Sequence, residues 1–144
     1  MKPEIRTIST GSFEMDYAVF GTGSTPMVIL PGMSLHPVTP SEDLVSGAFR
    51  CFREDYTVYL FDRRKLMHRG FTIDDMSEDV YRCLEKLGVK EINAYGVSQG
   101  GMIVQDMTIN HPELTEKLAY IKKVVSTEED RFAATIDSGL TILS

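Results

Sequence analysis

The fold of this chain is decided by one stretch, Ala94-Tyr95-Gly96-Val97-Ser98-Gln99-Gly100-Gly101-Met102. It places a G-x-S-x-G pattern between a strand-like run at residues 91–95 and a helix-like run at residues 100–110. Glycines on both sides of the serine remove side chains that would collide with neighbouring backbone in a tight turn. The pattern therefore predicts a sharp strand-to-helix turn that exposes the Ser98 hydroxyl at a helix N-terminus, where partial positive charge favours an anion. The alternative interpretation is a glycine-rich turn whose only role is close packing.

The composition is typical of one globular domain. The chain has 144 residues, of which 42% are hydrophobic and 25% are charged, which are ordinary values for a soluble protein. The net charge of −6 argues against nucleic acid and anionic membranes as partners, because their phosphates would be repelled. No stretch has the length of a membrane span, and residues 1–6 lack the apolar core of a secretory signal. We therefore expect a single domain over residues 1–144 and a cytoplasmic location.

The cysteines and histidines give no sign of a disulfide, a metal or a cofactor. Cys51 and Cys83 are far apart and fall on predicted apolar helix faces, which favours two buried free thiols. His36, His68 and His111 are scattered over different elements without ligand spacing. A nucleotide-binding fold is disfavoured as well, because no G-x-G-x-x-G pattern opens the first helix.

Hydrophobic patterning predicts five strands. Residues 4–10 and 13–20 alternate apolar and polar side chains, with a Gly11-Ser12 turn between them, as in an antiparallel hairpin. Residues 27–30 form a continuous apolar run that suits a strand buried on both faces. Further strands are expected at residues 56–61 and 91–95.

Helices are expected between and after these strands. Thr39-Pro40-Ser41-Glu42 has the residues of a capping box with Thr39 at the N-cap, and its helix should bury Leu44, Val45, Phe49 and Phe52. A second helix, capped by Thr72 and stopped by Gly88, carries apolar residues at three- and four-residue spacing, namely Ile73, Met76, Val80, Cys83, Leu84 and Leu87. The third spans residues 99–110. This order predicts an α/β fold, with a mostly parallel sheet, an N-terminal antiparallel hairpin and flanking helices.

Residues 3–118 resemble the N-terminal half of the α/β-hydrolase fold family. The resemblance is carried, in the order of the family, by Leu30-Pro31-Gly32-Met33, Phe61-Asp62-Arg63-Arg64, residues 74–80, residues 96–102 and residues 110–114. These segments look like the oxyanion loop, the end of the fourth strand, the next helix, and the nucleophile elbow with the helix after it. The resemblance implies that the C-terminal strands and the cap of the family are absent. Residues 119–144 diverge, and their pattern is compatible with one more strand near 118–125 and a helix near 126–137.

The resemblance also implies an esterase-like activity on a small-molecule ester, thioester or amide. Ser98 would be the nucleophile and form an acyl-enzyme. The backbone N–H groups of Met33 and Gln99 would form the oxyanion hole. Family members with an aspartate nucleophile, such as haloalkane dehalogenases and epoxide hydrolases, are not matched at position 98.

The catalytic base is not evident. The family places its acid and histidine after the serine, and His111, which ends the third helix, lies about 18 Å from Ser98 along the helix axis. We therefore interpret His111 as a helix-end residue that meets terminal carbonyls. His36 and His68 are the candidates for a base or for pocket residues, because each is expected on a loop at the edge of the sheet that carries Ser98.

Three interpretations follow for the chain as a whole. It is a fragment of a longer hydrolase, a homo-oligomer in which a second chain completes the site, or a non-catalytic binding module on the same fold. Asp62, at a strand end, is expected to form a structural salt bridge with Arg63 or Arg64.

Overall fold

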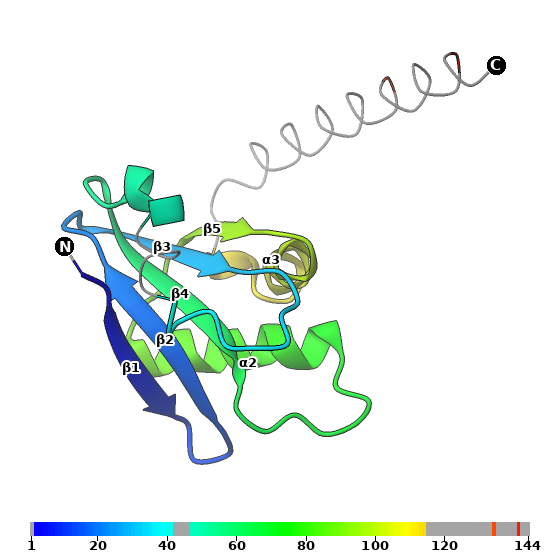
Figure 1. Cartoon of the computed structure of the whole chain (residues 1–144). Coiled ribbons are helices and arrows are strands. Elements are labelled where there is room, and N and C mark those ends of the chain that lie inside the picture. The colour runs from blue at the N-terminus through cyan, green and yellow to red at the C-terminus, as the bar shows by residue number, and fades with distance from the viewer. Residues whose placement is uncertain (1, 42–46, 115–133, 135–140, 142–144) are drawn as a thin grey trace.

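The computed structural model describes residues 2–41, 47–114, 134 and 141. They contain a five-stranded sheet in the order β1-β2-β4-β3-β5, with helices α2 and α3 packed on it (Figure 1). The elements in chain order are β1 (Glu4–Ser9), β2 (Glu14–Phe20), β3 (Thr25–Leu30), η1 (Arg50–Phe52), β4 (Tyr56–Arg64), α2 (Ile73–Leu87), β5 (Asn93–Gly96), α3 (Gln99–Asn110) and η2 (Pro112–Leu114). The strand and helix expected after residue 118 lie outside the described residues.

The sheet is mixed. β1 pairs antiparallel with β2, and β2 pairs antiparallel with β4. β3 lies between β4 and β5 and is parallel to both. The predicted α/β fold with an N-terminal hairpin is confirmed, and the carboxyl ends of β3, β4 and β5 meet at one edge, which is where sites form in such sheets.

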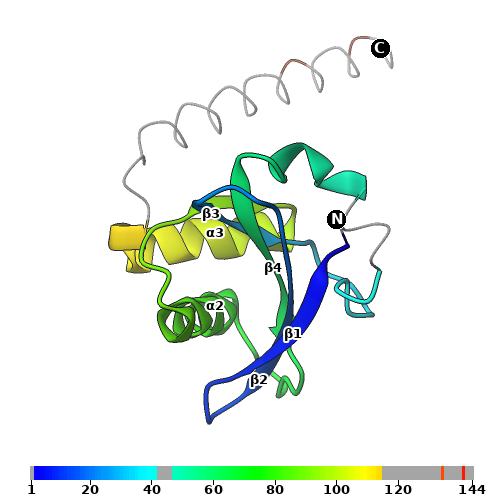
Figure 2. The same cartoon turned by 90° about the vertical axis from the view of Figure 1, so that its left-hand side faces the viewer.

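The two faces of the sheet have different covers. Helices α2 and α3 lie on one face, and η1 lies on the other together with Val38 and Phe49 (Figure 2). Successive residues of β3 alternate between them: Val28 and Leu30 join the core under the helices, and Met27 and Ile29 join the opposite core. Because a strand points its side chains alternately to either face, the apolar run is buried on both sides, as predicted.

Helix α2 begins and ends as its sequence predicts. The Thr72 hydroxyl accepts a hydrogen bond from the N–H of Asp75, and the Asp75 carboxylate accepts one from the N–H of Thr72, which completes a capping box. Gly88 ends the helix in the left-handed conformation, at a φ of 72°.

The capping box predicted at Thr39 is wrong. Thr39 is buried in a turn closed by a hydrogen bond from the Ser41 N–H to the Val38 carbonyl, and its hydroxyl donates to Asp62 instead of capping a helix. Leu44 and Val45 lie outside the described residues, whereas Phe49 and Phe52 pack, as expected, against the core that contains Met27 and Ile29.

Within the described part of the chain, no helix combines the length and the apolar character that a membrane crossing requires.

We predict that Leu84→Ala lowers the free energy of unfolding by about 2–5 kcal/mol, because it deletes a fully buried side chain between α2 and the sheet. Ile109→Ala on α3 is the matched control, since Ile109 is 77% exposed and its truncation should change that energy by less than about 0.5 kcal/mol. Urea unfolding of both variants measures the difference. Equal losses would contradict the assigned core.

The two cysteines differ in reactivity. Cys83 is buried, and burial raises the pKa of its thiol to about 12, but Cys51 is exposed, so its predicted burial is wrong. The thiolate is the reactive form. A disulfide reagent at pH 8 should therefore modify Cys51 in the folded protein and both thiols in denaturant. Rapid modification of both in the native state would contradict this assignment.

Candidate active site

Ser98 lies in a strained turn between β5 and α3. Its φ is 54° and its ψ is −118°, and it is the only non-glycine residue with positive φ in the part of the chain that the structure describes. Ser98 is the N-cap of α3, yet its side chain makes no capping hydrogen bond, and the residue is exposed. The predicted strand–turn–helix around this serine is confirmed. Strain of this kind is found where a structure holds a functional group in place.

Two glycines allow this turn to approach its neighbours closely. A Cβ atom at Gly96 would lie 2.4 Å from the carbonyl oxygen of Gly100, and one at Gly100 would lie 2.0 Å from the carbonyl oxygen of Leu30. The Val97 N–H also donates to the Leu30 carbonyl, at 3.1 Å. The first turn of α3 is therefore packed against the end of β3 at backbone contact.

The loop after β3 passes beside the serine. A Cβ atom at Gly32 would lie 3.5 Å from the Cβ atom of Ser98, so the loop backbone is in contact with the turn. Gln99 is the first residue of α3, where helical N–H groups have no partner within the helix. The N–H groups of Met33 and Gln99 donate to no acceptor among the described residues. Gln99 directly follows Ser98, and Met33 follows the loop residue that contacts it.

Asp62 anchors this loop. Met15 pairs with Arg64 and Tyr17 with Phe61, so β4 carries one extra residue at Asp62 and forms a bulge. The buried Asp62 carboxylate accepts hydrogen bonds from the N–H of Val38 at 2.7 Å, and from the N–H and hydroxyl of Thr39 at 3.1 and 2.5 Å.

The expected salt bridge from Asp62 to a neighbouring arginine is wrong. Arg64 forms a two-pronged ion pair with Asp79 of α2 at 2.7 and 2.5 Å. Arg63 instead turns toward the serine turn and donates to the Pro31 carbonyl at 2.7 Å and to the Gln99 side-chain oxygen at 3.3 Å. Adjacent strand residues point to opposite faces of the sheet, and the extra residue in β4 changes which face Arg63 and Arg64 each take.

Neither loop histidine has a hydrogen bond to Ser98. His36 is exposed on the loop between Pro31 and Val38, and its N–H donates to the Ser34 hydroxyl at 3.3 Å. His68 is exposed on the loop after β4, with Nδ1 3.0 Å from the Arg69 carbonyl oxygen and its ring against Phe71. Both loops begin at the edge of the sheet where Ser98 lies.

His111 follows the last residue of α3 and is engaged by other groups. Its Nε2 atom is 3.0 Å from a carboxylate oxygen of Glu78, and its ring stacks on Tyr81 at a centroid distance of 3.5 Å. Its side chain therefore contacts carboxylate and aromatic groups of α2, whereas its backbone N–H meets the carbonyl of Met107. The contact that we predict between His111 and a carbonyl at the end of α3 is therefore made by the His111 backbone N–H and not by its side chain.

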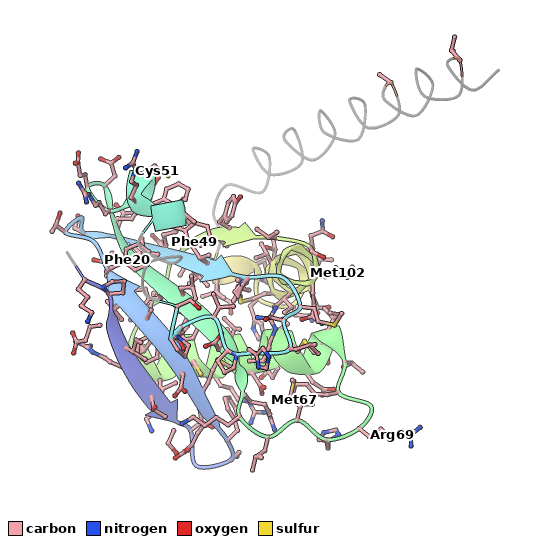
Figure 3. All side chains as sticks on the ribbon, viewed as in Figure 1. Phe20, Phe49, Cys51, Met67, Arg69 and Met102 are labelled. Carbon is pink, nitrogen blue, oxygen red and sulfur yellow. The ribbon has the colours of Figure 1, made fainter. Side chains whose placement is uncertain are left out.

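Exposed apolar side chains occur on the segments around Ser98. Met33 is 81% and Leu35 96% exposed on the loop after β3, and Leu66 and Met67 are exposed on the loop after β4. Met102, in the first turn of α3, also extends into solvent (Figure 3). We call these five exposed residues the apolar rim.

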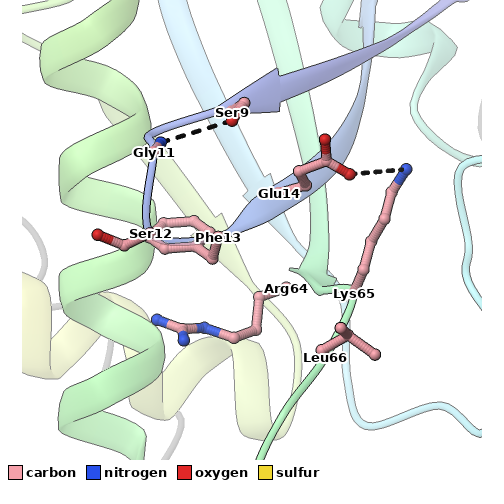
Figure 4. A pocket seen from close by; sticks show the side chains of 8 residues that line it. All are labelled: Ser9, Gly11, Ser12, Phe13, Glu14, Arg64, Lys65 and Leu66. Carbon is pink, nitrogen blue, oxygen red and sulfur yellow. Dashed lines mark hydrogen bonds and ion pairs between the residues drawn. The ribbon is translucent and has the colours of Figure 1, made fainter.

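A hollow of about 380 Å³ lies elsewhere, at the tip of the β1–β2 hairpin and the end of β4 (Figure 4). Its cations already have partners, because Arg64 pairs with Asp79 and Lys65 with Glu14 and Asp16. Among the described residues, no three His, Cys, Asp or Glu side chains are grouped as metal ligands.

A partly parallel sheet with an N-terminal antiparallel hairpin, followed by a sharp strand–turn–helix at Ser98, is the arrangement of the N-terminal half of the α/β-hydrolase fold. The family model described as "alpha/beta hydrolase fold" matches residues 25–137. The chain belongs to this family.

Several solved structures have a fold similar to that of this chain. E-2-(acetamidomethylene)succinate hydrolase matches with a TM-score of 0.67 and 14% identity, over 78% of this chain and 42% of that one. Epoxide hydrolase VrEH1 from Vigna radiata matches with a TM-score of 0.63 and 17% identity, over 79% of this chain and 38% of that one. A proline iminopeptidase-related protein from Thermus thermophilus matches with a TM-score of 0.61 and 20% identity, over 78% and 42%. At these identities the likeness shows the fold, and this chain spans about two fifths of each structure.

A second similarity is of another kind. The chain is 38% identical over 77 residues to the alanine–tRNA ligase of Natranaerobius thermophilus, and 36% identical over 76 residues to that of Desulforamulus reducens. Each match covers 53% of this chain and 8% of the ligase. The matched segment is a small part of a much longer protein.

We predict that Gly100→Ala displaces the first turn of α3, because its Cβ atom would lie 2.0 Å from the Leu30 carbonyl oxygen. Backbone cannot yield as a flexible side chain does, so thermal stability should fall clearly. Gly101→Ala is the matched control one residue later, where the nearest atom outside the helix would be at 3.4 Å. Alanine is favoured over glycine inside a helix, so the control should keep or gain stability. Equal losses in thermal unfolding would contradict the close contact.

Proposed function

We propose that this chain carries the nucleophile and oxyanion hole of a serine hydrolase that acts on a small-molecule ester, thioester or amide. The single observation that supports this most is the backbone of Ser98, an exposed residue at the start of α3 that is strained at a φ of 54°. A packing turn does not require a serine in this conformation, whereas a nucleophile elbow does.

The proposed reaction follows from the groups at the turn. The Ser98 oxygen attacks the substrate carbonyl carbon as its proton passes to a base, and negative charge develops on the carbonyl oxygen. The N–H groups of Met33 and Gln99 donate to that oxygen. The alcohol, thiol or amine then leaves with a proton, and water hydrolyses the acyl-enzyme. The apolar rim contacts the substrate's uncharged part.

The base is proposed to be His36 or His68, or a histidine supplied by a second copy of the chain or by a further part of a longer protein. His36 and His68 are exposed and lie on loops that begin at the edge of the sheet where Ser98 lies. His111 is not proposed, because Glu78 and Tyr81 already hold its ring. A homo-oligomer in the cytoplasm is part of the same proposal.

The second candidate is a non-catalytic binding module. It is favoured by one observation, which is that no described histidine makes a hydrogen bond to the serine hydroxyl. A serine without a base stays protonated near neutral pH and is a weak nucleophile.

We predict that a fluorophosphonate probe labels Ser98 in the wild type and that Ser98→Ala abolishes labelling, as read by mass spectrometry of the modified peptide. Turnover of p-nitrophenyl acetate should fall roughly 10³-fold or more in this variant, since removing a nucleophilic serine removes the covalent route. Ser12→Ala, in the exposed turn between β1 and β2, is the control, and Ser98 should still be labelled in this variant.

His36→Ala and His68→Ala distinguish the bases, because loss of a general base lowers the rate by about 10²–10⁴-fold. Light scattering of the same samples reports whether activity accompanies self-association. A wild type that neither reacts with the probe nor turns over the ester would overturn a base supplied by His36, His68 or a second copy of the chain, and would favour the binding module.

A further inference from the structure

Arg63 connects the two segments that carry the proposed oxyanion donors. Its Nη2 atom donates to the Pro31 carbonyl at 2.7 Å, and its Nε atom donates to the Gln99 side-chain oxygen at 3.3 Å. Pro31 begins the loop that leads to Met33, and Gln99 begins α3. One guanidinium therefore joins the end of β3 to the first turn of the helix after the serine.

This placement depends on the bulge in β4. Asp62 and Arg63 together lie opposite Asp16, where a regular ladder would place one residue. Bulges re-aim side chains and are common beside active sites. Here Arg63 reaches Pro31 and Gln99, and Arg64 reaches Asp79 of α2.

The environment of Arg63 is costly for a positive charge. Burial lowers the pKa of its guanidinium, and the nearby Asp62 carboxylate partly opposes this shift. Its Nη1 atom is buried without a hydrogen-bond partner among the described residues. Asp62 uses its oxygens for Val38 and Thr39, so Arg63 is held mainly by two uncharged acceptors. A position that only needed packing would be filled more favourably by an apolar side chain.

A guanidinium suits this bridge better than an amine does. Its N–H groups form a planar, rigid fork that can reach two acceptors in fixed directions. A lysine carries the same charge, but its ammonium group is a single donor centre on a flexible stem. It cannot bind the Pro31 carbonyl and the Gln99 side-chain oxygen together in the geometry of the guanidinium.

We propose that Arg63 is a positioning residue that sets the distance between the Met33 and Gln99 N–H groups by holding Pro31 and the Gln99 side chain together. The bridge is a feature of the structure, and its catalytic consequence rests on the serine hydrolase function proposed above. Asp62 holds the far end of the same loop through Val38 and Thr39, so β4 secures the loop at both ends.

The first test measures the bridge without activity. In Arg63→Met, the ¹⁵N order parameters of Gly32 and Met33 should fall from about 0.85, the value of rigid backbone, to below about 0.6. Arg64→Met is the matched control, because it removes a neighbouring guanidinium that binds α2 instead, and it should leave these two values unchanged. Arg63→Lys should give intermediate values and serves if the methionine variant does not fold.

The second test measures the catalytic consequence with the fluorophosphonate labelling rate of Ser98. Arg63→Met should slow labelling about 10- to 100-fold, since small displacements of positioned groups have effects of this size. Arg63→Lys should recover part of the rate. Gln99→Ala keeps the backbone donor and removes only the side chain that Arg63 binds. It should slow labelling in the wild-type background and have no further effect in Arg63→Met.

The outcomes separate the two proposals. Unchanged order parameters in Arg63→Met, or an equal effect of Gln99→Ala in both backgrounds, would overturn the positioning role. Order parameters that fall in a protein whose wild type is never labelled would support the bridge and overturn a hydrolase function completed by this chain alone or by its second copy. If the labelling rate of Ser98 fell equally in Arg64→Met and Arg63→Met, and only in proportion to the fall in melting temperature, the positioning role would also be overturned.

Discussion

The structure depends on the contact between the end of β3 and the first turn of α3. The Leu30 carbonyl accepts a hydrogen bond from the Val97 N–H, and the same oxygen lies where a side chain on Gly100 would have to be. This contact forces the chain to reverse within a few residues, and Ser98 absorbs the reversal through its positive φ. The strain is tolerated because α3 is held elsewhere by buried residues such as Ile103 and Met107.

A second constraint acts from the neighbouring strand. The bulge in β4 places a carboxylate and a guanidinium at the sheet edge, where Asp62 binds Val38 and Thr39 and Arg63 binds Pro31. The two charges thus bind backbone and side-chain groups of a loop instead of each other. Such a loop can stay exposed, as Met33 and Leu35 are, and still keep a defined backbone path.

The spacing of apolar residues and the residues that begin and end helices were sufficient to predict most of the fold. The hairpin, the apolar run of β3 and helix α2 with its Thr72 and Gly88 ends follow from local chemistry that does not depend on distant residues. The capping box at Thr39 failed because the distant Asp62 carboxylate binds both the N–H and the hydroxyl of Thr39 in a turn, and Pro40 and Ser41 are not helical. The exposure of Cys51 was missed because an apolar helix face was assumed where the chain forms a short 3₁₀ turn. In the site, the serine turn was predictable from its glycines, whereas the partners of Arg63 and Arg64 were not. A single extra residue in a strand changes which side chains face which neighbour, and no local pattern marked that bulge.

The positions of the histidines limit how the serine could be activated. The His111 ring is held by Glu78 and Tyr81 of α2. The His68 ring contacts the ring of Phe71, which lies on the same loop. His36 differs, because it lies between Pro31 and Val38, the two points at which β4 holds the loop. A base at His36 and an oxyanion donor at Met33 would share one anchored segment. In that arrangement Asp62 and Arg63 would position both groups relative to Ser98, although neither touches the substrate. If a second chain supplied the base, β4 would still position the Met33 N–H group, but it would not position the base.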